Sequence, residues 1–207
     1  HLLERGIEPL VLEAGSGPAS AVSEWAHVRL FSKWSELIDG ASRRLLLTTS
    51  WTEPADEYPT GAQWISEYLA PLAKALGARV RYNSRVVGVG KKGRDRSVVS
   101  GREDQPFTIH VENSDGDEER LEATSVIDAS GTWSNPSPAG ADGMPALGEG
   151  SAASSGVLGY KIPTLEDARS FSGKHVVVVG NGASAKTAIT LLAQTARHDP
   201  STQVTWV

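Results

Sequence analysis

Apolar residues near the C-terminal end of the chain change from a continuous run to a helical period. Val176–Val179 is a continuous apolar run, and it predicts a strand buried on both faces, as in a parallel sheet. Residues 183–197 then place small and apolar side chains on one face at helical spacing, and this pattern ends before Pro200. Val204–Val207 is a further strand-like run. The order strand, helix, strand predicts a βαβ unit.

The N-terminal part of the chain has a weaker pattern. Residues 10–12 predict a short buried strand that follows a helix end at Gly6, where a left-handed glycine is typical, and that ends at Glu13. Residues 16–58 have no clear period, and 44–49 fits either a strand or a short helix. We expect the six tryptophans of the chain to pack mainly in the core.

The middle of the chain predicts one helix followed by strands. Thr60–Gln63 matches a capping box, apolar residues recur at helical spacing as far as Leu76, and Pro71 should kink this helix. From there the period changes to two, with Asn113–Asp117 as a turn. The expected strands are 80–82, 85–89, 107–111 and one that begins with Val126–Asp128.

Composition narrows the functional classes. The 207 residues suffice for one large domain or two small ones, and a net charge of −5 leaves no basic footprint for nucleic acid. The absence of cysteine excludes a disulfide framework, a thiolate zinc site, a cysteine nucleophile and a dithiol redox relay. The histidines lack metal-ligand spacing, and the apolar runs are too short to span a membrane. We therefore expect no metal, no membrane partner and a cytoplasmic location.

The most informative motif follows the valine run. Gly180, Gly182 and Ala185 form G-x-G-x-x-A between the predicted strand and helix. In a dinucleotide-binding unit, the first glycine permits the tight turn, the second lets the pyrophosphate approach the backbone, and the third small residue lets helix pack on strand. The helix N-terminus then attracts the anion. The expected cofactor-binding residues are Gly180, Asn181, Gly182, Ala183, Ser184 and Ala185.

Two other interpretations of this stretch remain open. One is a glycine-rich turn in a sheet that binds no ligand. The other is a P-loop, because Gly180, Ala185, Lys186 and Thr187 match G-x-x-x-x-G-K-T except that Ala185 replaces the second glycine. A P-loop would make the protein a nucleotide hydrolase, although it leaves Gly182 unexplained.

Several segments resemble two-dinucleotide flavoproteins, which bind both FAD and NAD(P)H. Residues 3–14, ending in Leu-Val-Leu-Glu-Ala, resemble the second strand of their FAD domain, and Val126–Pro136 resembles the strand and turn by which their chain leaves that domain. Lys174–Leu192 is similar to the glycine loop of their NAD(P)H domain. Residues 25–32, 58–61 and 144–149 further resemble a bacterial branch of FAD-dependent, NAD(P)-binding oxidoreductases related to flavin monooxygenases.

The resemblance implies roles for individual residues. Glu13 would bind the adenosine ribose of FAD, Val86 would offer backbone groups to the adenine, and Arg29 would approach the flavin. Four residues would pass near the FAD: Ala129, Ser130, Gly131 and Thr132. The Baeyer–Villiger and flavin-monooxygenase fingerprint Phe-x-Gly-x-x-x-His is not matched, because Val177 stands where its histidine would be, so these residues do not predict monooxygenation.

Together these observations predict an α/β protein with two Rossmann-like dinucleotide-binding domains, both incomplete. We expect a partial FAD domain over 1–133, a connecting segment over 134–170 and the start of an NAD(P)H domain over 171–207. The predicted function is hydride transfer from NAD(P)H to FAD and on to an unknown acceptor or oxygen, with these residues alone inactive. A redox-silent dinucleotide-binding scaffold is the alternative. We expect the substrate to be a small molecule, and its identity stays open. The oligomeric state and the catalytic residues also stay open.

Overall fold

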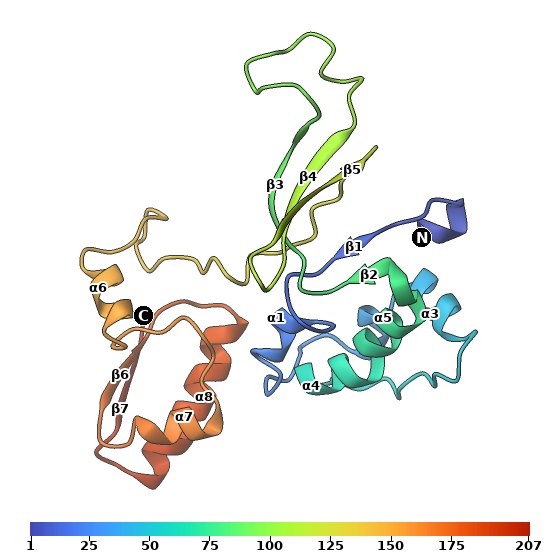
Figure 1. Ribbon diagram of the computed structural model, residues 1–207. Helices are drawn as coiled ribbons and strands as arrows, with labels where there is room; N and C mark the ends of the chain where they lie inside the picture. The colour runs from blue at the N-terminus through green and yellow to red at the C-terminus, as the bar shows by residue number, and fades with distance from the viewer. The chain divides into compact units, whose positions relative to one another are not determined.

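The computed structural model describes all 207 residues, and the chain divides into two compact units, His1–Gly131 and Thr132–Val207 (Figure 1). The first unit contains α1 (Ser20–Ser23), α2 (Trp34–Leu37), α3 (Gly40–Leu46), α4 (Gly61–Trp64), α5 (Ala70–Leu76), β1 (Val11–Leu12), β2 (Val80–Arg81), β3 (Arg85–Lys91), β4 (Phe107–Glu112) and β5 (Glu118–Ala123). The second contains α6 (Glu149–Ser154), α7 (Leu165–Ser170), β6 (His175–Val178), α8 (Ala183–His198) and β7 (Gln203–Trp206).

The short helices of the first unit surround an apolar core. Its buried members are Trp34, Ile38, Leu46 and Tyr68. α3 places Leu46 in this core, and it begins where the Asp39 side chain accepts the backbone N–H groups of Ala41 and Ser42. The ambiguous residues 44–49 therefore begin inside a helix and include no strand.

Pro71 changes the hydrogen bonding of the helix that contains it. The capping box predicted at Thr60 and Gln63 starts α4. Because proline has no N–H, Pro71 cannot bond to the carbonyl of Glu67, four residues earlier. Residues Ile65–Leu69 form a π-helical turn before α5 instead. The freed Glu67 carbonyl accepts the indole N–H of Trp51 at 2.6 Å, which ties the helix to the preceding segment.

Two sheets complete the first unit. β1 pairs in parallel with β2, and β3, β4 and β5 form an antiparallel meander. The predicted alternation in β4 is confirmed, because Ile109 and Val111 are buried. Asn113 Oδ1 accepts the N–H groups of Asp115 and Asp117, which closes the predicted turn. β5 was not predicted, because its residues are mostly charged, yet it pairs with β4 along its whole length.

Two expectations for this unit are wrong. Residues Val126–Asp128 form no strand, because no neighbouring backbone pairs with them, and Ile127 is 73% exposed. The strand predicted at residues 10–12 is present as β1 but is not buried, since Leu10 and Val11 are 53% and 42% exposed. β2 is its only hydrogen-bonded neighbour, so no second strand shields its other side.

The second unit is built on the predicted βαβ unit. β6 and β7 are parallel and α8 connects them, with α7 and α8 on the same side of the strands (Figure 1). Leu192 of α8 and Ala168 of α7 are buried, and the Thr195 hydroxyl donates to the Ala168 carbonyl at 3.1 Å. The expectation that the valine run is buried on both faces is wrong. Val177 is 53% exposed because helices cover only one face.

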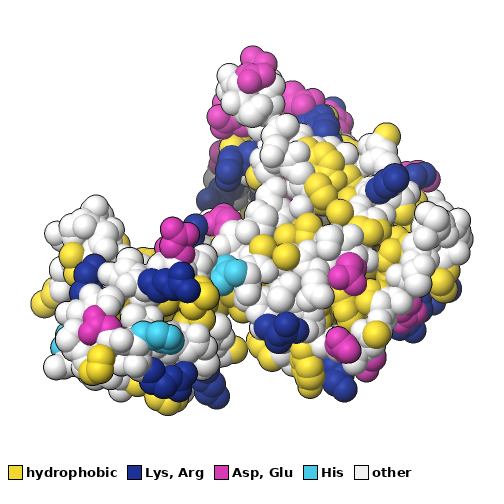
Figure 2. Space-filling view, turned by 90° about the horizontal axis from the view of Figure 1, so that it is seen from below, with side chains coloured by type: hydrophobic (Ala, Val, Ile, Leu, Met, Phe, Trp, Pro, Cys, Tyr) yellow, Lys and Arg dark blue, Asp and Glu magenta, His cyan; other side chains and the backbone are white.

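The molecular surface mixes apolar and charged side chains. Figure 2 shows apolar side chains exposed between acidic and basic ones on one face. None of the helices has both the length and the apolar composition needed to cross a membrane.

Candidate dinucleotide sites

The glycine loop begins immediately after β6 and is held by the end of β7. Gly180 has φ +117°, a backbone conformation that residues with a Cβ rarely adopt. Its N–H donates to the Val207 carbonyl at 2.8 Å, and its carbonyl accepts the indole N–H of Trp206 at 2.6 Å. The first glycine of the motif is therefore required by the local backbone.

The second glycine of the motif has no internal reason to be glycine. Gly182 lies in extended backbone, φ −77° and ψ −179°, which any residue adopts. A Cβ placed on it would meet no heavy atom within 4 Å. The absent side chain leaves open space in front of the loop, which is where a bound pyrophosphate would need to approach the backbone.

The first turn of α8 offers donors and no negative charge. Gly182 is its N-cap, no side chain caps the helix, and the first turn contains no acidic residue. The N–H groups of Ala183, Ser184 and Ala185 have no carbonyl one turn earlier within the helix, so they are available to an anion. The Ser184 side chain makes no capping hydrogen bond at this helix start.

The geometry of this loop differs from that of a P-loop. In a P-loop the residues between the two glycines form the loop, and the helix follows. Here α8 begins at Ala183, so Lys186 and Thr187 already lie inside the helix. The Thr187 hydroxyl donates to the Ala183 carbonyl at 3.0 Å, an ordinary bond to the preceding turn. The P-loop interpretation is not favoured.

In the first unit, Glu13 sits at the carboxyl end of β1. Its backbone N–H donates to the Arg81 carbonyl at 2.9 Å, which continues the pairing with β2. Its side-chain Oε1 accepts the N–H of Gly15 at 2.7 Å. A Cβ on Gly15 would lie 1.9 Å from Ser20 Oγ, so glycine is required there by packing. The carboxylate is thus fixed at the strand end.

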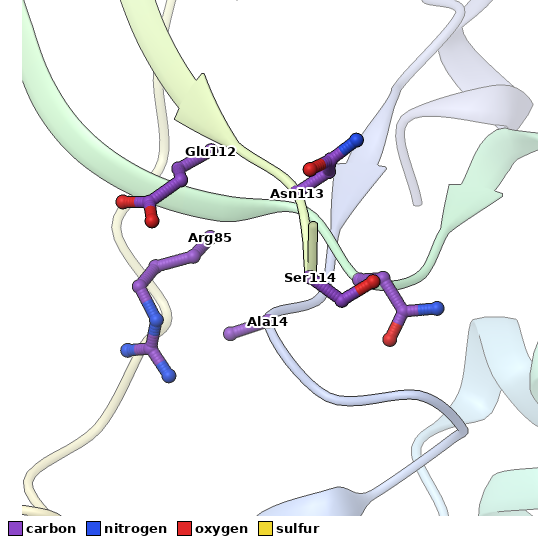
Figure 3. A pocket seen from close by; sticks show the side chains of 6 residues that line it. Ala14, Arg85, Glu112, Asn113 and Ser114 are labelled. Atoms are coloured by element: carbon purple, nitrogen blue, oxygen red, sulfur yellow. The ribbon is translucent and has the colours of Figure 1, made fainter. Parts of the chain in front are cut away.

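A polar pocket of about 270 Å³ opens beside this strand end (Figure 3). Figure 3 shows the Arg85 and Glu112 side chains on one side, with Ala14 facing them. Ala14 follows Glu13 and Arg85 precedes Val86, so the pocket is lined by sequence neighbours of two predicted FAD contacts, while Glu13 and Val86 themselves do not line it. The lining residues are Ala14, Asn83, Arg85, Glu112, Asn113 and Ser114.

The charged residues of this pocket, Arg85 and Glu112, were not predicted from the sequence. Arg85 and Glu112 are directly opposite each other in the pairing of β3 with β4. The strand register could have found them. The predicted turn Asn113–Asp117 begins just after Glu112 at the end of β4, and Arg85 stands beside the predicted contact Val86 at the start of β3. Trp206 was not predicted as a loop contact either. It was expected to pack in the core with the other tryptophans, but its side chain is 53% exposed.

The predicted residue Arg29 lies in a different part of the first unit. It forms a β-bridge with Thr60, and its guanidinium donates to the Tyr58 carbonyl. The two segments approach closely, because a Cβ on Gly61 would lie 2.9 Å from the Ala26 Cα. Arg29 does not line the pocket beside Glu13.

Residues Ala129–Thr132 form an exposed segment without regular structure. Asp128 Oδ1 accepts the hydroxyl of Ser130 at 2.7 Å and its N–H at 3.0 Å. These hydrogen bonds hold the pKa of the Asp128 carboxyl below its usual range. The bond from the Ser130 hydroxyl has the larger effect and the bond from its N–H the smaller. Gly131 follows with φ +69°. None of these residues lines the pocket either.

Comparison with known proteins identifies the fold class. Residues 50–207 match the family of L-lysine 6-monooxygenase/L-ornithine 5-monooxygenase. No curated protein sequence matches the chain. Among solved structures, bacillithiol disulfide reductase Bdr (YpdA) from Bacillus cereus is similar, with 21% identity and a TM-score of 0.64 over 99% of this chain. The chain spans 52% of that protein. This likeness supports the predicted α/β, Rossmann-like fold.

Proposed function

The chain belongs to the L-lysine 6-monooxygenase/L-ornithine 5-monooxygenase family, and we propose that the protein is an FAD-dependent oxidoreductase that draws its electrons from NAD(P)H. The observation that carries this proposal is Gly182, a glycine that neither backbone conformation nor packing requires. It stands at the uncapped N-terminus of a 16-residue helix. A diphosphate that approaches the loop closely accounts for both features.

In the second unit, the pyrophosphate of NAD(P)H would bind at Gly180–Ala185. The N–H groups at the start of α8 would donate to its oxygens, and the helix dipole would favour its negative charge. Arg197 and His198 in the last turn of α8 complement the opposite end of the dipole. Thus the helix as a whole suits an anion at its beginning.

In the first unit, the adenosine half of FAD would bind beside Glu13. The Glu13 Oε1 is engaged by the Gly15 N–H, which leaves Oε2 to accept a ribose hydroxyl. The adjacent pocket would take the adenine near the backbone of Val86, with Arg85 and Glu112 at its wall. We further propose that Ala129–Thr132 pass near the FAD, as the family resemblance implies.

The bound flavin would supply the redox chemistry, since it accepts a hydride from a nicotinamide and passes electrons to oxygen or another acceptor. We propose oxygen as the acceptor, because the family is that of two monooxygenases. An amino acid with a terminal amine, such as L-lysine or L-ornithine, is then the substrate class. Residues 1–207 contain no cysteine, so they supply no dithiol for a disulfide substrate. The chain's contribution is binding and orientation, and we assign no catalytic acid or base within it.

Anaerobic mixing of the flavin-loaded, full-length protein with NADPH or NADH tests this proposal. We expect loss of visible flavin absorbance with at least one nicotinamide, followed by its return when oxygen is admitted. A protein that binds FAD but is reduced by neither nicotinamide would be a redox-silent scaffold and would contradict the proposal. ATP-stimulated release of phosphate would instead support a nucleotide hydrolase.

A further inference from the structure

Trp206, the last residue of β7, and Val207, which follows it, hold both backbone polar groups of Gly180. The Gly180 N–H donates to the Val207 carbonyl at 2.8 Å, and the Trp206 indole N–H donates to the Gly180 carbonyl at 2.6 Å. The first of these bonds continues the pairing of β6 with β7, in which Val207 N–H also donates to the Val178 carbonyl. The second is made by a side chain, and strand pairing does not account for it.

The bond from Trp206 fixes the peptide group that begins the glycine loop. The Gly180 carbonyl and the Asn181 N–H belong to one planar, trans peptide, so they point in opposite directions. When the carbonyl is held toward Trp206, the Asn181 N–H must face away from it. At φ +117°, Gly180 has the broad conformational freedom of glycine, and the indole bond restricts it.

Core packing does not explain the presence of tryptophan at this position. Trp206 is 53% exposed, whereas Trp34 in the first unit is 4% exposed. The polar edge of the exposed ring is nevertheless directed at the loop, because its N–H bonds to the Gly180 carbonyl. Trp206 is half-exposed, and its one hydrogen-bond donor contacts the loop. Both facts fit a role in shaping the loop.

We propose that Trp206 is a positioning residue for nicotinamide-dinucleotide binding, through its hydrogen bond to the Gly180 carbonyl. The inference rests on the proposed function, since it requires NAD(P)H to bind at Gly180–Ala185. Trp206 holds the first peptide of the loop, before the ligand binds, in the orientation that the bound state requires. Binding is then tighter because less of the loop remains to be ordered.

The variant Trp206→Phe removes the indole N–H and keeps an aromatic side chain on the strand. In the full-length protein, we expect NADPH or NADH, whichever the wild type binds, to bind about threefold to tenfold more weakly, as for one lost hydrogen bond. The nicotinamide concentration that gives half-maximal flavin reduction should rise, while the rate at saturation stays unchanged. A purely structural role would not produce this separation.

The matched control is Thr205→Val, on the same strand. Thr205 Oγ1 lies 2.8 Å from His175 Nε2, so this variant also removes one side-chain hydrogen bond of the β6–β7 pair, but not one to the loop. We expect its nicotinamide affinity to equal that of the wild type. The role of Trp206 would be overturned, with the proposed function left intact, if Trp206→Phe bound the nicotinamide as tightly as the wild type. The same would follow if both variants bound it equally more weakly. A wild-type protein that binds neither nicotinamide would overturn the proposed function and this inference together.

Discussion

Gly15 and Gly182 each follow a parallel strand by a few residues, yet they are glycines for different reasons. A Cβ on Gly15 would lie 1.9 Å from Ser20 Oγ and 2.3 Å from Ser20 Cβ, so the fold excludes any larger residue. A Cβ on Gly182 would touch nothing. Packing within the chain therefore explains the glycine at position 15 and does not explain the one at position 182, for which we propose close approach of a diphosphate.

The two strand ends also differ in the hydrogen-bonding groups that they present. The end of β1 carries the Glu13 carboxylate, which accepts hydrogen bonds. The end of β6 leads to the uncapped N-terminus of α8, which donates them. An acceptor suits ribose hydroxyls and a set of donors suits a diphosphate. The proposed division of the two cofactors between the units follows from this chemical difference.

The largest expected effect is on the stability of the first unit. Gly15→Ala should lower the free energy of unfolding by ~1–3 kcal/mol, the usual cost of overpacking. Urea denaturation measures this change, and the affinity for the nicotinamide should not change. Ser20→Gly removes the obstructing side chain. Adding Gly15→Ala to the Ser20→Gly variant should therefore lower the free energy of unfolding much less than Gly15→Ala does in the wild type. Equal losses with and without Ser20 would show that the contact is not the cause.

At the other strand end, a substitution should change stability and binding in opposite directions. Gly182→Asp places a carboxylate at an extended N-cap, where it should cap α8 and raise stability by ~0.5 kcal/mol. The same carboxylate would occupy the proposed pyrophosphate position and repel it. We expect nicotinamide affinity, measured by calorimetry, to fall at least about tenfold, or ~1.4 kcal/mol.

The control for this variant is Gly159→Asp, which adds the same charge to the second unit. Gly159 also has no heavy atom near its Cβ position, and it lies outside α8 and the glycine loop. Its affinity should equal that of the wild type. Weakening by both variants would indicate a general effect of charge, and weakening by neither would place the pyrophosphate elsewhere.

A smaller effect is expected for Glu13→Gln. Glutamine keeps an oxygen for the Gly15 N–H but weakens the acceptor for the ribose, so FAD should bind about threefold more weakly, as for one hydrogen bond. Fluorescence titration of the flavin-free protein measures this affinity. Glu8→Gln is the matched control, because Glu8 pairs with Arg79 on the surface at 2.7 Å. If both variants lost FAD affinity equally, Glu13 would have no special role.

The smallest expected effect is electrostatic and concerns Asp128, beside the exposed segment Ala129–Thr132. Hydrogen bonds from Ser130 lower the pKa of the Asp128 carboxyl in the folded state. Their contribution to stability is therefore present above the ordinary aspartate range and is lost as the pH falls through the lowered pKa. Ser130→Ala should raise the pKa of Asp128 toward its usual value in a carboxyl titration followed by NMR. An unchanged pKa would assign the shift to another cause.

The elements that depend on local period were predictable from the sequence. The helical spacing over 183–197 and the capping box at Thr60 both predicted helices that the structure contains. β5 was not predictable from alternation, because its charged residues form a strand only through pairing with β4. The failure at Val126–Asp128 has the same origin, since apolar residues form a strand only beside a partner.

The candidate sites were predictable only where spacing along the chain sets the geometry. The glycine loop is such a case, because strand, turn and helix are consecutive. The Arg85–Glu112 wall and the Trp206–Gly180 bond join residues 27 and 26 positions apart, respectively, so they depend on strand register. The roles assigned to Glu13, Val86, Arg29 and Ala129–Thr132 stay predictions.

The central claim is that the backbone at the start of α8 binds the dinucleotide diphosphate. Its most direct test is an amide NMR spectrum of the isotope-labelled protein during titration with NADPH. We expect the N–H signals of Gly182, Ala183, Ser184 and Ala185 to shift together and to saturate with the calorimetric affinity. Saturable binding that leaves these four signals in place while others move would contradict the claim.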